Sequence, residues 1–285
     1  MKLAHRIEPG PPGAPTLLLL HGVTRNGRDW EPLLPALTRD WRVVVADHCG
    51  HGESPRTPGE YGVADYARHT AAFVQAAGLG PVTVAGHSLG AMVALSLAVE
   101  CPEHVAGIVL EDPPFHTMGG DIDRTLYRAQ FAGMAEVARA GGGVEAMATA
   151  LAEIRLDGTR RLGDLRDRAS LLFSAACLVQ MDPGVLDPLV AGRCLDGFDV
   201  VSLWPRVRCP VLLLQGDPAA GGAFTDADVA GARRALPGAV HVRFPGVGHQ
   251  IHRGSPAGFL GVLRDWARRN GMLPAGTGGD PGPAR

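Results

Sequence analysis

The sequence predicts an α/β protein with a mostly parallel central sheet that helices cover on both faces. Short apolar runs, typical of buried parallel strands, alternate along the chain with longer segments of helical periodicity. Glycine-containing turns follow several of these runs, at the ends where open α/β sheets bind their ligands. At 285 residues the chain is long enough for one such domain with a sizeable insertion.

The predicted strands are short, rich in valine, leucine and isoleucine, and bounded by glycine, proline or polar residues. They are 16–20, 42–46, 82–85, 107–110, 211–215 and 241–244. Helices are predicted between them at 30–37, 63–77, 91–100, 226–236 and 256–270. In the last helix Phe259, Leu263 and Trp266 recur at helical spacing, so this face is expected to pack on the sheet.

The segment 114–205 has almost no strand pattern and is predicted to be a helical insertion. Its helices are expected at 122–140, 144–154, 165–179 and 185–191. The chain is therefore divided into a first core part, 1–113, the insertion, 114–205, a second core part, 206–270, and a tail, 271–285. The tail is rich in glycine and proline and is expected to be disordered. An independent second domain is the alternative interpretation of the insertion.

Composition and charge narrow the class of protein. The formal net charge is −2, which gives no reason to expect a nucleic acid or an anionic membrane as partner. No segment reaches the length of a membrane span, and the first residues lack an apolar signal core. The five cysteines are odd in number and lack Cys-x-x-Cys pairing, which favours reduced thiols and a cytoplasmic location.

The strongest chemical signal is the run Gly86-His87-Ser88-Leu89-Gly90, between the strand 82–85 and the helix 91–100. A serine between two glycines on a strand-to-helix turn is typical of a nucleophile elbow. The glycines are needed because a side chain at either position would collide with the neighbouring strand or helix. The following helix N-terminus places a partial positive charge near Ser88. Ser88 is therefore predicted to be a nucleophile.

Two further stretches stand in the matching chain order. His21-Gly22 closes the strand 16–20, and Gly248-His249 follows the strand 241–244. With the elbow and the run 47–54, these residues resemble the α/β-hydrolase superfamily over about residues 14–270. The resemblance implies an α/β-hydrolase fold, with a helical cap, 114–205, inserted after the sixth strand of that fold.

The resemblance also implies roles for residues of this chain. Ser88 would attack a carbonyl carbon, and His249 would take its proton as general base. The backbone N–H groups of Val23 and Leu89 would form the oxyanion hole. A serine at this position favours acyl chemistry, whereas dehalogenases and epoxide hydrolases of this fold attack with a carboxylate.

A third residue, an acid, would orient His249 and complete a catalytic triad with Ser88. The sequence leaves open which acid this is. Most serine members of the family carry the acid after the seventh strand of the fold, three residues beyond a glycine, as Gly-x-x-Asp. Here the third residue after Gly216 is Ala219, which is not an acid, and Asp217 comes two residues early. Asp112 ends the strand-like run Ile108-Val109-Leu110-Glu111-Asp112 and lies 24 residues after Ser88, which resembles the acid placement of zearalenone lactonases and haloalkane dehalogenases. Asp112 is favoured, Asp217 is the main alternative, and Glu111 or another acid is the third.

We predict a serine hydrolase for an ester or lactone bond of a small to medium, largely apolar molecule. The alternatives are cleavage of a carbon–carbon bond in a diketone, amide hydrolysis, and a slow-turnover ligand-binding receptor of this fold. No cofactor and no metal site are expected, and the partner is a small-molecule substrate. One of the cap arginines could bind a substrate carboxylate, but the sequence does not select which. The oligomeric state is unknown from the sequence.

Overall fold

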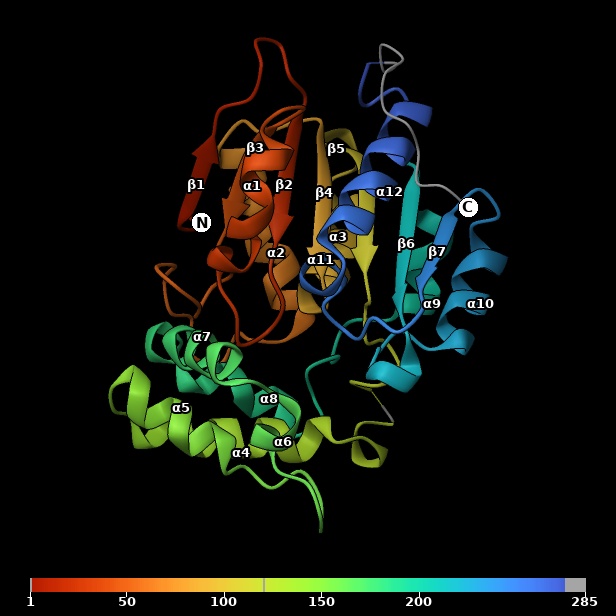
Figure 1. Cartoon of the computed structure of the whole chain (residues 1–285). Coiled ribbons are helices and arrows are strands. Elements are labelled where there is room, and N and C mark those ends of the chain that lie inside the picture. Colours follow the sequence, from red (N-terminus) through yellow and green to blue (C-terminus); the bar gives the residue numbers. More distant parts are fainter. Residues whose placement is uncertain (1, 120, 275–285) are drawn as a thin grey trace.

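A single seven-stranded sheet forms the centre of the molecule in the computed structural model, which describes residues 2–119 and 121–274 (Figure 1). The strand order is β1-β3-β2-β4-β5-β6-β7, and every pair is parallel except β1 with β3. The strands are β1 (His5–Glu8), β2 (Thr16–Leu20), β3 (Arg42–Ala46), β4 (Val82–His87), β5 (Val105–Glu111), β6 (Val211–Gly216) and β7 (Val240–Phe244). The predicted α/β-hydrolase fold is confirmed.

The sequence prediction missed β1, the antiparallel edge strand. Its residues are mostly exposed and polar, so it lacks the apolar run that marks the buried strands β2 to β6. It is held by pairing with β3, for example His5 opposite Ala46. Such a strand is specified by its neighbour rather than by its own composition.

Helices cover both faces of the sheet, as side chains that alternate along each strand require. One face packs against α1 (Leu34–Leu37) and α12 (Pro256–Arg269), through residues such as Leu37, Phe259 and Trp266. The other face packs against α2 (Val63–Ala76), α3 (Leu89–Glu100) and α10 (Asp226–Ala235). Figure 1 shows α12 and α1 in front of the sheet and α2 behind it. The short helix α11 (Ile251–Gly254) follows β7.

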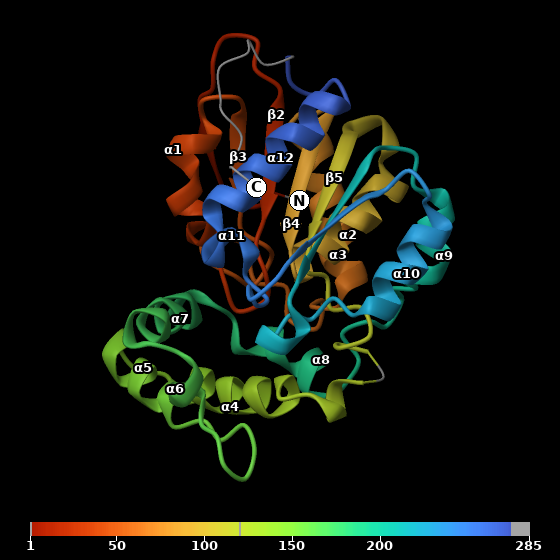
Figure 2. The same ribbon diagram turned by 45° about the vertical axis from the view of Figure 1, so that its right-hand side comes forward.

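The insertion between β5 and β6 is helical, as predicted. It contains α4 (Tyr127–Ala140), α5 (Val144–Ala152), α6 (Leu162–Leu165), α7 (Arg168–Gln180), α8 (Asp187–Val190) and α9 (Val200–Leu203). Helices α4 to α8 form a separate layer below the carboxyl ends of the strands (Figures 1 and 2). The short helix α9 instead lies beside α10 and contacts α3, so the last residues of the segment 114–205 pack on the core.

The chain beyond α12 differs from the expected tail 271–285. Leu273 is only 6% exposed and packs in the core cluster that includes Trp266. Met272 contacts Thr83 through its sulfur. Residues 271–274 are therefore ordered, because two apolar side chains return to the sheet after the helix ends. The remainder of the expected tail, 275–285, lies outside the described residues.

In the described part of the chain, no single helix has the length and apolar character needed to cross a membrane. Two consecutive described helices, Arg168–Gln180 and Pro183–Val190, are together long and apolar enough, but the chain bends by 111° between them.

Candidate active site

Ser88 lies on the predicted strained turn between β4 and α3. Its φ of 54° and ψ of −114° are unusual for a residue with a side chain. The flanking glycines are required by close packing: a Cβ on Gly86 would lie 2.1 Å from the carbonyl oxygen of Gly90. A Cβ on Gly90 would lie 2.3 Å from the carbonyl oxygen of Leu20. The local sequence thus determines the turn that presents Ser88.

The loop after β2 lies against this turn. A Cβ on Gly22 would lie 3.3 Å from the Cβ of Ser88, so only glycine lets the loop approach this closely. The next residue, Val23, lines the same cavity as Ser88 and Leu89. Leu89 is the first residue of α3, and its backbone N–H therefore has no partner within the helix. The two predicted oxyanion donors are thus on adjacent segments beside Ser88.

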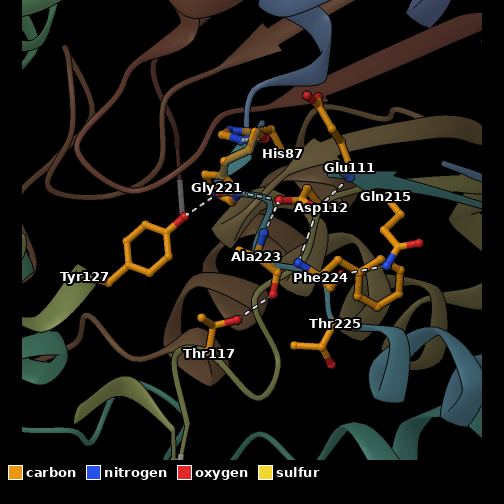
Figure 3. Close-up of polar contacts among 12 residues, drawn as sticks. His87, Glu111, Asp112, Thr117, Tyr127, Gln215, Gly221, Ala223, Phe224 and Thr225 are labelled. Carbon is orange, nitrogen blue, oxygen red and sulfur yellow. Dashed lines mark hydrogen bonds and ion pairs between the residues drawn. The ribbon is translucent and has the colours of Figure 1, made fainter. Parts of the chain in front are cut away.

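Asp112 and His249 are hydrogen-bonded to each other, with 2.7 Å between His249 Nδ1 and Asp112 Oδ2. Asp112 is fully buried and has a φ of 47°, a left-handed conformation just beyond the end of β5. Its carboxylate also accepts backbone N–H groups of Gly216 (2.8 Å), Ala223 (2.6 Å) and Phe224 (3.2 Å) (Figure 3). Because a carboxylate only accepts, the proton of this bond lies on Nδ1 of His249, which leaves Nε2 free to act as a base.

The two other candidate acids are engaged elsewhere. Asp217 accepts backbone N–H groups of Ala219 (3.0 Å) and Gly246 (2.8 Å), and so stabilises the turn after β6 and the one after β7. Glu111 binds a different histidine: His252 Nδ1 lies 2.8 Å from Glu111 Oε1. Of the three, Asp112 is the one that the described structure places within hydrogen-bond distance of His249.

His252 belongs to a buried charged cluster that the sequence analysis did not find. Its Nε2 lies 3.4 Å from Asp29 Oδ2, and Asp29 Oδ1 accepts from Arg253 Nη1 at 2.8 Å. Burial alone would lower the pKa of His252, but the charges and hydrogen bonds of Glu111 and Asp29 raise it to about 9. The sequence signal for this cluster is two adjacent acids, Glu111-Asp112, together with two histidines three residues apart, His249 and His252.

His87 lies under the loop after β7 that carries His249, the histidine loop, and hydrogen-bonds to it. It is buried beneath the elbow, and its Nε2 donates to the backbone carbonyl of His249 at 3.0 Å. Burial holds the pKa of His87 well below its usual value, so the ring is neutral. Histidines of other loops also bond to backbone carbonyls, His21 to Gly22 and His48 to His21.

Ser88 and His249 line one largely apolar cavity of about 60 Å³ between the core and the layer α4 to α8. Within the described residues, no hydrogen bond joins Ser88 Oγ to His249, a contact that often tightens only when substrate binds. Apolar side chains of α4 and α8 form part of the wall: Phe131, Met134 and Leu189. A wider groove of about 720 Å³ shares Tyr127, Arg166 and His249 with this cavity.

Tyr127 joins the helical layer to the core. Its hydroxyl donates to the backbone carbonyl of Gly221 at 3.3 Å (Figure 3). This contact between distant segments is not evident from the sequence. The ring of Tyr127 lies 6.0 Å from the ring of His249. Among the residues that the structure describes, no group of three or more His, Cys, Asp or Glu side chains could hold a metal ion.

The sheet order, the strained serine turn and the histidine loop after the last strand together define an α/β-hydrolase fold. The chain belongs to the α/β-hydrolase family, whose sequence profile, described as alpha/beta hydrolase fold, matches residues 15–156.

Similarity to known proteins extends over most of the chain in one case. The magnesium-chelatase 30 kDa subunit of Rhodobacter capsulatus is 31% identical over 271 residues, which covers 91% of this chain and 89% of that protein. Lipase LipV of Mycobacterium tuberculosis is 39% identical over 104 residues, 36% of this chain and 39% of the lipase. The enol-lactonase of Burkholderia xenovorans LB400 superposes with a TM-score of 0.71 at 20% identity, over 93% of this chain and 95% of that chain.

Proposed function

We propose that this protein is a serine hydrolase that cleaves an ester or lactone bond through an acyl-enzyme. The supporting observation is the hydrogen bond between Asp112 and His249, in a histidine loop that lines the same cavity as the strained Ser88. In this proposal Ser88 is the nucleophile, His249 the general base and Asp112 the acid of the triad. No cofactor is needed for this chemistry.

The first step forms the acyl-enzyme. Ser88 Oγ attacks the carbonyl carbon while His249 Nε2 takes the hydroxyl proton. The N–H groups of Val23 and Leu89 stabilise the negative charge that develops on the carbonyl oxygen. When the tetrahedral intermediate collapses, the bond to the leaving alkoxide breaks, and His249 returns the proton to that oxygen.

The second step hydrolyses the acyl-enzyme and releases the carboxylic acid product. Water attacks the acyl carbon, His249 takes a proton from the water, and Ser88 Oγ leaves with that proton. Asp112 keeps the His249 ring in one tautomer and stabilises the imidazolium that forms in each step. The two backbone N–H groups act again on the second intermediate.

The helical layer α4 to α8 is proposed to act as the cap that selects the substrate. Phe131, Met134 and Leu189 contribute apolar surface to the cavity with Ser88. Such walls suit a small to medium organic acyl group rather than a polymer. A cytoplasmic location and a small-molecule partner complete the proposal.

A fluorophosphonate probe together with a panel of esters and lactones tests the reaction. The wild-type protein should be labelled at Ser88 and should hydrolyse at least one class of these substrates. Ser88→Ala should lose labelling and turnover while its far-UV circular dichroism and Tm stay unchanged, because only a hydroxyl is removed. Labelling at another serine, or turnover retained in Ser88→Ala, would contradict the assignment.

The second candidate function is to assist a magnesium chelatase and raise its rate. The observation that favours it is the extent of the similarity to the magnesium-chelatase 30 kDa subunit, which spans 91% of this chain, against 36% for the lipase. Addition of the chain to a magnesium chelatase should then raise the chelatase rate. If Ser88→Ala raises it equally, the chain acts by binding; if only the wild type does, the hydrolase site is needed.

A further inference from the structure

The wall of the cavity with Ser88 and His249 contains arginine side chains but no carboxylate among the described residues. Two arginines line it, Arg25 from the loop after β2 and Arg166 from the segment between α6 and α7. Among the described residues that line this cavity there is no aspartate and no glutamate. The rest of the wall is largely apolar, so the two guanidinium groups face a medium in which charge is poorly solvated.

Arg25 is buried, with only 6% of its surface exposed. Its Nη1 donates to Ser174 Oγ at 3.0 Å, and its guanidinium lies 5.3 Å from the ring centre of Phe173. Both partners are uncharged. In the part of the chain that the structure describes, no carboxylate forms an ion pair with Arg25.

Arg166 is the less compensated of the two. It is half-buried, at the place where the cavity joins the wider groove. Within residues 2–119 and 121–274 its guanidinium makes no hydrogen bond and no ion pair. Burial and the nearby charge of Arg25 lower the pKa of Arg166 to about 10, which still leaves it protonated at neutral pH.

One buried acid, Asp29, acts through its charge on both arginines, but it is already paired with other cations. Asp29 is fully buried and binds Arg253 at 2.8 Å and His252 at 3.4 Å. His252 is also paired with Glu111 at 2.8 Å. In this cluster two carboxylates face two cations, so the cluster leaves no negative charge for Arg25 or Arg166.

We propose that the substrate of this site carries a carboxylate, which Arg166 binds with the help of Arg25 while the ester or lactone carbonyl faces Ser88. This inference rests on the proposed function. A guanidinium offers two parallel N–H groups to a carboxylate, and this pairing is strong where water is excluded. Gln130 and Gln250 line the cavity and the groove beside Arg166 and can donate further hydrogen bonds. The apolar wall holds the chain between the two polar groups.

The kinetic test compares monomethyl esters of the dicarboxylic acids from succinate to suberate with the matched esters whose free acid is a primary amide. For the best chain length, the wild type should prefer the acid by about tenfold or more in kcat/KM, since a hydrogen bond to a charged group is stronger than one to a neutral amide. Arg166→Gln should abolish this preference through KM, so that the ratio of kcat/KM for the acid ester to kcat/KM for the amide ester falls to about one. Arg166→Lys should restore part of it.

Arg168→Gln is the matched control. Arg168 is two residues away, is exposed at the start of α7 and pairs with Glu145 on the surface. It should keep the wild-type preference. If the wild type hydrolyses both esters equally well, or if Arg166→Gln keeps the preference, the carboxylate site is wrong while the hydrolase assignment stands.

A binding measurement on Ser88→Ala separates the two proposals, because it needs no turnover. Calorimetry should detect heptanoate and should find heptanamide much weaker, with the difference lost in Ser88→Ala/Arg166→Gln. If the wild type turns over no ester yet heptanoate binds in this Arg166-dependent way, the anion site stands and the hydrolase assignment fails. Equal or undetectable binding of the two ligands overturns the anion site.

Discussion

Glu111 and His252 form a buried pair, 2.8 Å apart, directly beside the pair made by Asp112 and His249. Adjacent residues at the end of β5 thus hold two histidines that lie three residues apart after β7. The His252 backbone N–H also donates to Glu111, at 2.9 Å. The loop that carries His249 is therefore tied to β5 at two points, which limits its motion relative to Ser88.

This pair predicts a pH dependence of stability. The pKa of His252 is raised to about 9 in the folded protein, against about 6.5 in the unfolded chain. A raised pKa stabilises the fold fully below pH ~6.5, and this contribution, ~3 kcal/mol at most, is lost as pH rises through ~9. Urea unfolding from pH 6 to 10 should show the decline.

The control for this prediction is Glu111→Gln, which removes the largest opposing charge. In this variant the decline should be smaller and should occur at lower pH, because Asp29 alone then faces His252. Glu103→Gln, at an exposed acid near His104, should behave as wild type. A wild-type free energy of unfolding that is flat across this range would rule out a charged His252.

Asp112→Asn should lower kcat by up to about 10⁴-fold with little change in KM. An amide at this position cannot hold the His249 tautomer with a proton on Nδ1, nor stabilise the imidazolium. Asp217→Asn is the comparison, and its effect on kcat should be small because Asp217 bonds to Ala219 and Gly246. Steady-state kinetics on one ester decides; the opposite ranking would move the acid to Asp217.

Phe131→Ala should shift the preferred acyl chain to longer esters. Phe131 is 5% exposed and lines the cavity from α4, so its removal opens space next to the acyl group. Val179→Ala, on an exposed residue of α7, is the control and should keep the wild-type chain-length profile. The rate of fluorophosphonate labelling should change little in both. An unaltered profile in Phe131→Ala would remove this part of the cap from substrate selection.

Gly86→Ala should destabilise the fold severely or prevent folding. The added methyl group would lie 2.1 Å from the Gly90 carbonyl oxygen, so β4 and α3 could not keep their approach. Gly261→Ala is a helical comparison, since open space surrounds that position in α12. It should raise stability by about 0.5–1 kcal/mol, because alanine favours helix more than glycine. Thermal unfolding of the two variants gives the comparison; a well-folded Gly86→Ala protein would contradict the packing argument.

Local pattern alone determined much of this protein. The strands β2 to β6 follow from apolar runs and β7 from alternating apolar residues, and the strained turn at Ser88 follows from two glycines at positions where any Cβ collides with backbone. These features depend on residues close together in the chain, so the sequence displays them directly. The edge strand β1 is the exception, because its partner β3 holds it in place.

Tertiary structure decided the contacts between distant residues. Three acids, Glu111, Asp112 and Asp217, remained candidates for the partner of His249, and the left-handed backbone of Asp112 turns its carboxylate toward that histidine. The sequence likewise did not distinguish Arg166 from the surface arginines of the cap. The capacity proposed for Arg166 to bind an anion depends on its burial and on the absence of an acid among the described residues that line the cavity. Burial and charge balance are set by segments that meet only when the chain folds, and for that reason composition and spacing do not reveal them.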